Sequence, residues 1–431
     1  MQLLYKLPLP VTVRNETSRV RAAITAFFAM DGFVFASWAV RIPAVKASVG
    51  ASPATLGIAL LGVSVGAIAT MALTGALCRR FGSPWLIVAG AVWLSLTLLL
   101  PALARSALAL GLGLAVFGIG YGGLNVAMNT LAVDLVAVLR RPVMPSFHAA
   151  WSLGGLAGAA LGGLAAPVLT PLAHFALVGL FGLAVTAVCG PIVLRTHLPV
   201  ARTGSTEDAA TASGPGGGGT AGTGAAEAHA EIPNGGGSQP PAAARSGVWR
   251  TVLLLGVIAL CSTYGEGAVS DWGALHLRED LGAASGLAAA GYAAFALAEA
   301  CVRLAGSTLL ARLGQTRVLV YGGVATFAGM IAAALSPVLP LALAGFALAG
   351  LGVANAFPTA MARVGILAGP HGVATASTLG YAGFLLGPPA IGFLAAAVSL
   401  PAALTTVSLL AAGAVVLARA AAPAGTAHER P

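Results

Sequence analysis

The sequence predicts an all-α membrane protein with twelve transmembrane helices in two six-helix bundles. Three observations support this fold class. The 431 residues are 58% hydrophobic and only 8% charged, with a mean hydropathy of +0.92, which is too apolar for a water-soluble globule. The apolar residues form twelve runs, and each is long enough to cross a bilayer, which takes about 20 residues. A hydrophilic stretch at about residues 196–247 divides the runs into six and six.

The first six runs predict an N-terminal bundle over residues 1–198. Basic residues lead directly into a full-length first span, so we expect that span to remain as a transmembrane helix rather than to be removed as a signal peptide. The predicted spans cover residues 22–40, 54–77, 85–104, 107–131, 145–166 and 171–194.

The last six runs predict a C-terminal bundle over residues 248–431, after a linker at 199–247. Residues 203–244 are mostly Gly, Ala, Thr and Pro with few large apolar side chains, which predicts a flexible cytoplasmic tether. The loop between residues 335 and 339 is so short that its two helices must be antiparallel neighbours. The predicted spans cover residues 252–272, 286–310, 318–335, 339–362, 373–397 and 401–418.

The basic residues predict the orientation. With a cytoplasmic N-terminus, seventeen of the 22 Lys and Arg residues fall inside and four outside, and only Arg303 lies within a span. This asymmetry follows the positive-inside rule and predicts that both termini are cytoplasmic, in a multi-pass protein of the bacterial cytoplasmic membrane. The formal charge of +9 therefore reflects topology. Because the basic residues are spread over the loops without forming a stripe, we expect no nucleic-acid partner.

The sequence contains no pattern typical of an enzyme or of a metal site. The four cysteines stand apart from one another, and no ligand set has metal-binding spacing. The Gly-x-Gly at residues 111–113 lies inside an apolar helix without a preceding strand, so it does not predict a dinucleotide site. We therefore expect no cofactor and no metal, and a transporter rather than an enzyme.

The two halves repeat one another. Arg80 and Gly82, in the loop before the third span, recur 232 residues later as Arg312 and Gly314. A set of residues in the fourth span recurs after 229 residues. Parallel repeats of this kind are typical of transporters whose halves rock about a binding site at their interface, near the bilayer midplane.

Four segments carry a resemblance to a known family. The loop at residues 75–82, Gly-Ala-Leu-Cys-Arg-Arg-Phe-Gly, matches the signature of the major facilitator superfamily between its second and third helices, except that Arg79 replaces an acidic residue. The chain resembles this superfamily over nearly its whole length, the linker excepted. The segments at 147–155, 266–272 and 380–389 resemble a bacterial branch of mostly uncharacterised inner-membrane facilitators, which is similar to fucose-permease-type sugar symporters. The resemblance implies structural or gating roles for Arg79, Arg80 and Gly82.

Ionisable residues inside a membrane are costly and usually functional, so each is a candidate. Asp31 lies about ten residues into the first span, close to the middle of the bilayer. We interpret it as a proton-coupling or substrate-binding acid, although an acid that pairs with a polar neighbour for packing is the alternative. Glu266, which we expect nearer the outer side of the seventh span, is the second proton-coupling candidate. Asp271 beside Trp272 is expected to mark the outer interface.

Other polar residues are candidates for the substrate cavity or for gating. Glu299 and Arg303 lie one helical turn apart, and we expect a neutralised gating pair near the cytoplasmic end. The predicted gating or structural residues also include His148, Trp151, Gly383, Gly387 and Pro388. The polar residues on the fourth and tenth helices can contact substrate or can bond neighbouring helices instead. The predicted substrate-cavity residues are Trp38, Tyr121, Asn125, Asn129, Asn355 and Tyr381.

The sequence therefore predicts a secondary active transporter that moves a small polar organic solute, sugar-like or a metabolite or drug, by alternating access and with proton coupling. The expected partners are the lipid bilayer, the small-molecule substrate and protons, and the expected state is a monomer. One alternative is a non-transporting membrane sensor with the same fold, and another is an exporter rather than an uptake symporter. A membrane-embedded enzyme is not favoured, because no reactive constellation gathers at one face.

Overall fold

The computed structural model describes residues 11–139, 143–196 and 242–421, and every regular element within these residues is a helix. The predicted linker at 199–247 lies almost wholly outside the described residues, as do the two ends of the chain. The domain boundaries and the cytoplasmic location of the termini therefore stay predictions, whereas the all-α fold is confirmed.

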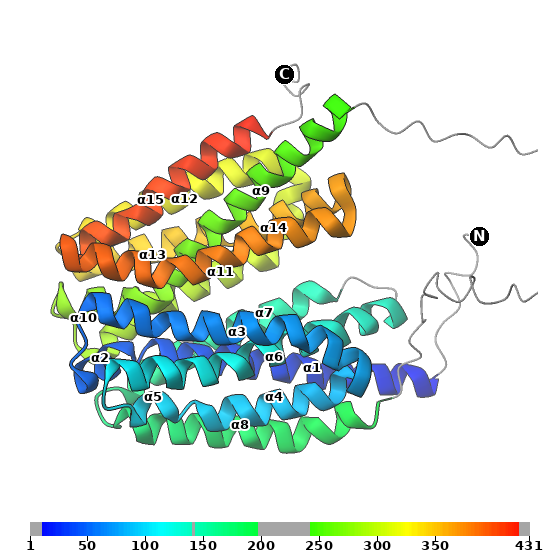
Figure 1. Ribbon diagram of the computed structural model, residues 1–431, viewed down its shortest axis with the longest axis horizontal. Coiled ribbons are helices and arrows are strands. Elements are labelled where there is room, and N and C mark those ends of the chain that lie inside the picture. Colours follow the sequence, from blue (N-terminus) through cyan, green and yellow to red (C-terminus); the bar gives the residue numbers. More distant parts are fainter. Residues whose placement is uncertain (1–10, 140–142, 197–241, 422–431) are drawn as a thin grey trace, which may run out of the picture.

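The helices of the N-terminal half lie together as one bundle, in the lower part of Figure 1. Its long helices pack side by side, and the short helices α2 and α5 connect them at one end. The elements are α1 (Val11–Ala39), α2 (Ile42–Val49), α3 (Pro53–Phe81), α4 (Ser83–Thr97), α5 (Leu100–Leu103), α6 (Ala107–Leu139), α7 (Met144–Ala165) and α8 (Pro171–Leu194).

The helices of the C-terminal half form a second bundle above the first (Figure 1). Its first helix continues through a π-helical turn, η2, into a short helix, α10, so that this part of the chain is helical without interruption. The elements are α9 (Ala242–Ala268), η2 (Val269–Gly273), α10 (Ala274–Glu279), α11 (Ser285–Leu313), α12 (Gln315–Leu335), α13 (Leu339–Val353), α14 (Ala356–Ala397) and α15 (Leu400–Ala420).

Eleven helical segments in the described residues are long and apolar enough to cross a membrane. The remaining predicted span corresponds to α7, whose 22 residues give a length of about 33 Å but include many Gly, Ser and other weakly hydrophobic residues. This helix packs between α1 and α11, at the boundary between the halves, where it is less exposed to lipid. The multi-pass membrane fold is thus confirmed, and the count of twelve spans stays a prediction.

The repeated turn between the second and third helices of each half has the same backbone conformation in both halves. Gly82, between α3 and α4, has φ +84°, and Gly314, between α11 and α12, has φ +76°. Residues with a side chain rarely adopt this left-handed region, so glycine is required at both positions. The repeat that the sequence predicts at these two loops is therefore present in the structure.

Helix α14 doubles back on itself, although all 42 of its residues are helical. The rings of Phe357 and Tyr381 lie 6.3 Å apart, whereas 24 residues of straight helix would separate them by about 36 Å. The Ser377 hydroxyl likewise lies 3.3 Å from the Met361 sulfur. The end of the predicted tenth span and the whole eleventh span are thus antiparallel parts of this one element.

The two halves contact each other at the end of the molecule that carries α2 and α10. The ammonium group of Lys46 on α2 pairs with the Glu279 carboxylate on α10 at 2.6 Å. Helices α3 and α14 approach so closely there that a Cβ atom on Gly57 would lie 2.6 Å from the backbone oxygen of Pro388. By the predicted orientation, this is the outer side of the membrane.

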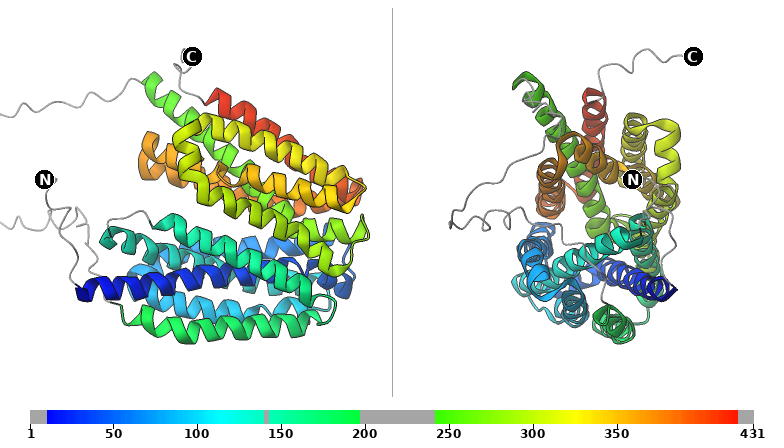
Figure 2. Two further views of the ribbon diagram at one scale, coloured as in Figure 1. Left: turned by 180° about the vertical axis from the view of Figure 1, so that it is seen from behind. Right: turned by 90° about the vertical axis from the view of Figure 1, so that its right-hand side faces the viewer.

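The halves diverge toward the opposite end, where α1 and α9 begin (Figure 2, left). An open depression of about 820 Å³ lies there along one face of α1, lined by residues from Ser18 to Ala29. With the orientation that the sequence predicts, contact at the end with α2 and α10 and divergence at the other end correspond to an inward-facing arrangement.

Candidate substrate and proton site

A cavity with an empty volume of about 320 Å³ lies between the two halves, and both halves contribute to its wall. The N-terminal half supplies Phe35 from α1, Tyr121 from α6 and Trp151 from α7. The C-terminal half supplies side chains from α9, η2, α11 and α14. They are Glu266, Ser270, Tyr292, Phe295, Glu299 and Phe384.

The N-terminal wall of the cavity is a cluster of three aromatic rings. The rings of Phe35 and Tyr121 stack with centroids 5.3 Å apart, and the Trp151 ring lies 6.4 Å from Phe35. Each ring comes from a different helix, so the cluster joins α1, α6 and α7. Aromatic pairs at these separations are favourable and restrict one another, which gives this wall a defined shape.

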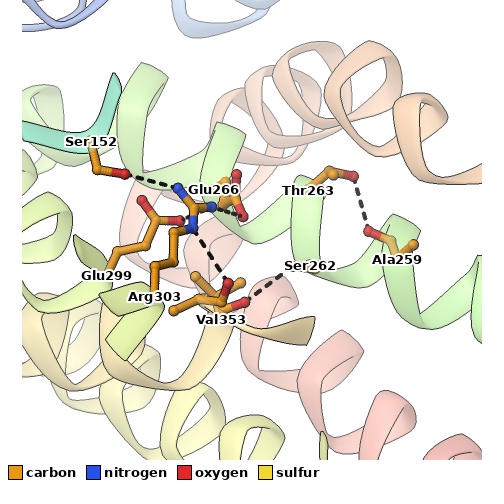
Figure 3. Close-up of polar contacts among 9 residues, drawn as sticks. Ser152, Ala259, Ser262, Thr263, Glu266, Glu299, Arg303 and Val353 are labelled. Atoms are coloured by element: carbon orange, nitrogen blue, oxygen red, sulfur yellow. Dashed lines mark hydrogen bonds and ion pairs between the residues drawn. The ribbon is translucent and has the colours of Figure 1, made fainter. Parts of the chain in front are cut away.

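The opposite wall contains a buried ionic cluster centred on Arg303 of α11 (Figure 3). Its guanidinium lies 2.5 Å from the Glu299 carboxylate, one turn earlier on the same helix, and 3.4 Å from the Glu266 carboxylate on α9. It also donates a hydrogen bond to the Ser152 hydroxyl on α7, at 3.1 Å. One guanidinium thus connects α11 to α9 in its own half and to α7 in the other half.

The pairing of Glu299 with Arg303 agrees with the prediction, but the predicted depths are wrong. Glu266 was expected nearer the outer side and the pair near the cytoplasmic end, whereas all three groups lie together beside the cavity. Glu299 is the middle residue of α11, because this helix continues to Leu313, beyond the predicted end of the span.

Asp31 lies directly behind the aromatic wall. Its side chain is 0% exposed, and the Trp151 indole donates a hydrogen bond to Oδ2 at 3.0 Å. The other carboxylate oxygen, Oδ1, is buried without a hydrogen-bond partner. Because Trp151 lines the cavity, Asp31 is separated from it by a single side chain. Its proton-coupling role stays a prediction.

The π-helical turn η2 places a further carboxyl group near the cavity. Ser270 lines the cavity and donates a hydrogen bond to the Asp271 carboxylate at 3.3 Å. The expectation that Asp271 and Trp272 mark the outer interface is wrong, because the helical run continues to Glu279 and Trp272 is 0% exposed.

Of the residues predicted for the substrate cavity, the structure places only Tyr121 in its wall. Asn129 donates to the Asn125 backbone oxygen at 2.8 Å and to its side-chain oxygen at 3.3 Å, so this pair bonds within α6. Asn355 is buried at the break between α13 and α14.

Two aromatic residues predicted for the cavity lie outside its wall. Trp38 is 1% exposed and packs against Phe175 of α8, with ring centroids 6.1 Å apart, inside the core of the N-terminal bundle. Tyr381 is 38% exposed and packs beside Phe357, within the hairpin of α14.

The predicted gating residues have varied surroundings. Trp151 belongs to the cavity wall, and the exposed His148 lies 5.6 Å from the Phe28 ring, between α7 and α1. Arg79 and Arg80 are exposed at the end of α3, where Arg80 lies over the Phe81 ring.

The small residues predicted on the eleventh helix, Gly383, Gly387 and Pro388, lie at packing contacts of α14. Gly383 meets the backbone of α9 at Leu260, and Gly387 lies beside Tyr264 of the same helix. The backbone oxygen of Pro388 faces Gly57 of α3, in the other half. These residues let α14 approach both neighbours closely.

Six residues of the site were not predicted from the sequence: Phe35, Ser152, Ser270, Tyr292, Phe295 and Phe384. Ser152, Ser270 and Phe384 lie in segments that carried the family resemblance. A further signal was present in the pattern Gly-Tyr-Ala-x-Phe, which occurs at residues 291–295 on α11 and again at 380–384 on α14. Both phenylalanines of this repeated pattern line the cavity.

A cavity shared by two helical bundles in a membrane is typical of transporters. The sequence model of the Major Facilitator Superfamily matches residues 22–382. The chain therefore belongs to the Major Facilitator Superfamily. It is a multi-pass transporter of the cell membrane and not an enzyme, and its partners include the bilayer and a small-molecule substrate.

Two bacterial relatives match nearly the whole chain. An uncharacterised transporter, y4wD, of Sinorhizobium fredii is 32% identical over 408 residues, covering 92% of this chain and 96% of the relative. An uncharacterised transporter of the same superfamily from Yersinia pestis is 32% identical over 398 residues, covering 92% and 94%. The predicted resemblance to a branch of uncharacterised bacterial facilitators is thus confirmed.

Solved structures of transporters share the fold. The nucleoside transporter NupG superposes with a TM-score of 0.67 at 14% identity, covering 93% of this chain and 98% of the other. The fucose:proton symporter FucP of E. coli superposes with a TM-score of 0.59 at 15% identity, covering 93% and 98%. At these identities the likeness concerns the fold alone.

Proposed function

We propose that this protein is a secondary active transporter that moves a small polar organic solute across the membrane by alternating access and couples the movement to protons. The observation that carries the proposal is the central cavity, whose wall is built by both halves and contains two carboxyl groups, Glu266 and Glu299. A site that both halves share changes shape when the halves rock.

The contacts between the halves support alternating access. At the outer end, the pair Lys46–Glu279 and the close approach of Gly57 to α14 hold the halves together. At the opposite end, where α1 and α9 begin, the two bundles diverge (Figure 2). The outer contacts named here are one ion pair and a close approach of glycine backbones, so they can separate while the cores of the two bundles stay intact.

The charges of the ionic cluster support proton coupling. Glu266 and Glu299 share one guanidinium, that of Arg303, so the cluster is neutral only when one of the two carboxyl groups carries a proton. Binding or loss of that proton changes the net charge of a buried site, which alters the free energy of closing water out of the cavity. Proton entry releases about 2.3 kcal/mol per 100 mV of membrane potential, enough to bias the cycle.

The solved neighbours support a small polar solute. The structural neighbours named above are a nucleoside transporter and a fucose:proton symporter, both of which carry polar solutes.

The test is transport by the full-length protein in proteoliposomes that contain a pH-sensitive dye. We expect at least one class among monosaccharides, nucleosides and small amines to change the internal pH beyond the change in protein-free liposomes. We expect Glu266→Gln and Asp31→Asn to abolish the proton movement. The matched control is Asp280→Asn, an acid outside the cavity that pairs with His276 on the short helix α10.

If every solute class fails in protein that binds at least one of them, the transport proposal is wrong. If solute moves in both variants with an unaltered response to pH, transport stands and the assignment of the coupling residues is wrong.

A further inference from the structure

The lining and the charge of the central cavity point to a particular class of substrate. We propose that the cavity binds a small organic ammonium ion, which takes the place of the proton held by Glu266 and Glu299. This inference rests on the proposed function and specifies both its substrate class and its direction of coupling.

The first support is the aromatic character of the wall. Six of the nine lining residues are aromatic, and they surround the cavity from both halves. The faces of aromatic rings attract cations, and cages of such rings are a recurring way to hold ammonium groups. The six aromatic residues are Phe35, Tyr121, Trp151, Tyr292, Phe295 and Phe384.

The second support is an excess of acidic groups. Four carboxyl groups lie in or immediately behind the wall: Asp31 on α1, Glu266 on α9, Asp271 on η2 and Glu299 on α11. Among the described residues that contact these acids, Arg303 supplies the only permanent positive charge. Helix α6 contributes Tyr121, α7 contributes Trp151 and Ser152, and α14 contributes Phe384, all of which are uncharged near neutral pH.

A buried site cannot keep this excess of negative charge without protons or a positively charged ligand. An ammonium ion between the aromatic wall and Glu266 would supply the missing positive charge. Glu266 is the suitable partner, because it lies 3.4 Å from Arg303 whereas Glu299 lies 2.5 Å from it. Glu266 is thus the less firmly paired of the two carboxyl groups.

Two other substrate classes fit the wall less well. An anion would need a free cationic group, but the Arg303 guanidinium already contacts Glu299, Glu266 and Ser152. A neutral sugar would need several free neutral donors and acceptors around its hydroxyls. Two of the four neutral polar side chains in the wall, Trp151 and Ser270, already donate to Asp31 and Asp271. Asn125 and Asn129, which could serve a sugar, bond to each other within α6.

Shared use of Glu266 determines how the fluxes are coupled. If the ammonium ion and the proton require the same carboxylate, each displaces the other, and the proton leaves to water when the cation binds. Each crossing of the site then carries either a proton or the cation. Inward proton movement would drive the cation outward, which makes the protein a cation–proton exchanger that exports its substrate.

The cavity is small, so small ammonium ions are the appropriate probes. Choline, ethanolamine and tetramethylammonium represent the class. Choline has a matched neutral control in dimethylbutanol, in which a carbon atom replaces the quaternary nitrogen.

The test measures binding of these probes to the purified full-length protein by isothermal titration calorimetry. We expect at least one ammonium probe to bind with a Kd about tenfold or more below that of its neutral isostere, a difference of about 1.4 kcal/mol. We expect the affinity to rise with pH and each binding event to release a proton, as shown by titration in buffers of different ionisation enthalpy. Glu266→Gln should lose both effects, and Asp280→Asn should keep them.

If the neutral isosteres bind as tightly as the cations, if a neutral sugar is preferred, or if no ammonium probe binds at millimolar concentration, the proposal is overturned. The pH dependence and proton release of the unmodified protein test it even if Glu266→Gln fails to fold. Flux in proteoliposomes separates the two proposals. Cation binding without transport contradicts the proposed function alone, whereas proton-coupled uptake of a neutral sugar supports transport and contradicts the cation class.

Discussion

The guanidinium of Arg303 donates a hydrogen bond to the Ser152 hydroxyl across the boundary between the two halves of the molecule, at 3.1 Å. The same guanidinium holds Glu299 at 2.5 Å within its own half. The buried charges are therefore connected directly to the relative position of the halves. In the proposed mechanism, a change in the protonation of the carboxyl groups alters the charge around Arg303 and with it the bond to α7, which would link proton binding to the rocking of the halves.

Replacement of Arg303 by Met should strongly destabilise the protein, because it leaves Glu266 and Glu299 buried without a positive partner. Loss of one partner of a buried ion pair costs about 3–5 kcal/mol. Unfolding with heat in detergent, followed by circular dichroism, measures the loss. Addition of Glu299→Gln to Arg303→Met should restore a large part of the stability. A double variant as unstable as Arg303→Met alone would contradict the electrostatic explanation.

Trp151→Phe should expose the dependence of Asp31 on its single hydrogen-bond donor. The substitution keeps an aromatic ring in the wall but leaves both oxygens of the buried carboxyl group without a partner. A buried acceptor that loses its partner costs about 1–3 kcal/mol. Thermal unfolding measures this loss, and a double-mutant cycle with Asp31→Ala, which removes the acceptor, isolates the interaction.

The coupling energy between Trp151→Phe and Asp31→Ala in this cycle should be at least about 0.5 kcal/mol, the lower limit for groups in contact. Additive effects of the two substitutions would mean that the bond at 3.0 Å contributes nothing to stability. Phe35→Leu is the control in the same wall, since its ring contacts Trp151 but donates no hydrogen bond to Asp31.

The outer ion pair should bias the protein toward the inward-facing arrangement. Lys46 and Glu279 pair at 2.6 Å between the halves, but the Glu279 side chain is 44% exposed, so the pair contributes at most about 1 kcal/mol. Lys46→Ala should therefore raise the outward-facing population by up to about fivefold. Electron spin-resonance distances between labels at the outer ends of the halves measure this population. The exchanged pair Lys46→Glu with Glu279→Lys should reverse the shift, and high salt should weaken it in the original protein.

The fold follows from the sequence to a large extent, because lipid permits few structures. Helices must satisfy their own backbone groups in a bilayer, so apolar runs of sufficient length predict helices directly. Features that depend only on a local backbone turn or on the spacing of residues along one helix were also predictable. Gly82 and Gly314 adopt the same left-handed turn, and Glu299 pairs with Arg303 because helical neighbours four residues apart share a face.

The candidate site was harder to predict, because an apolar helix gives little indication of which face meets the cavity. Helix α1 is apolar over most of its circumference and is packed by α6, α7 and α8, so the sequence could not distinguish Phe35, in the wall, from Trp38, in the core. The depths of Glu266 and Arg303 were misjudged because α9 and α11 extend beyond the predicted spans. Hydropathy indicates neither how far a helix extends beyond the bilayer nor how the helix is rotated about its own axis.

Gly57→Ala should open the outer end of the transporter without unfolding either bundle. A Cβ atom at Gly57 would lie 2.6 Å from the Pro388 backbone oxygen and 3.1 Å from the Gly392 Cα atom, both on α14 in the other half. The obstruction lies between the halves, so separation of α3 from α14 relieves it, and the outward-facing population should rise. Gly413→Ala is the matched control, because nothing lies within 4 Å of its Cβ position. Labelling of a cysteine at the outer end of α3 with an impermeant reagent reports the opening. If Gly57→Ala leaves the labelling rate equal to that of Gly413→Ala, the contact between α3 and α14 does not close the outer side.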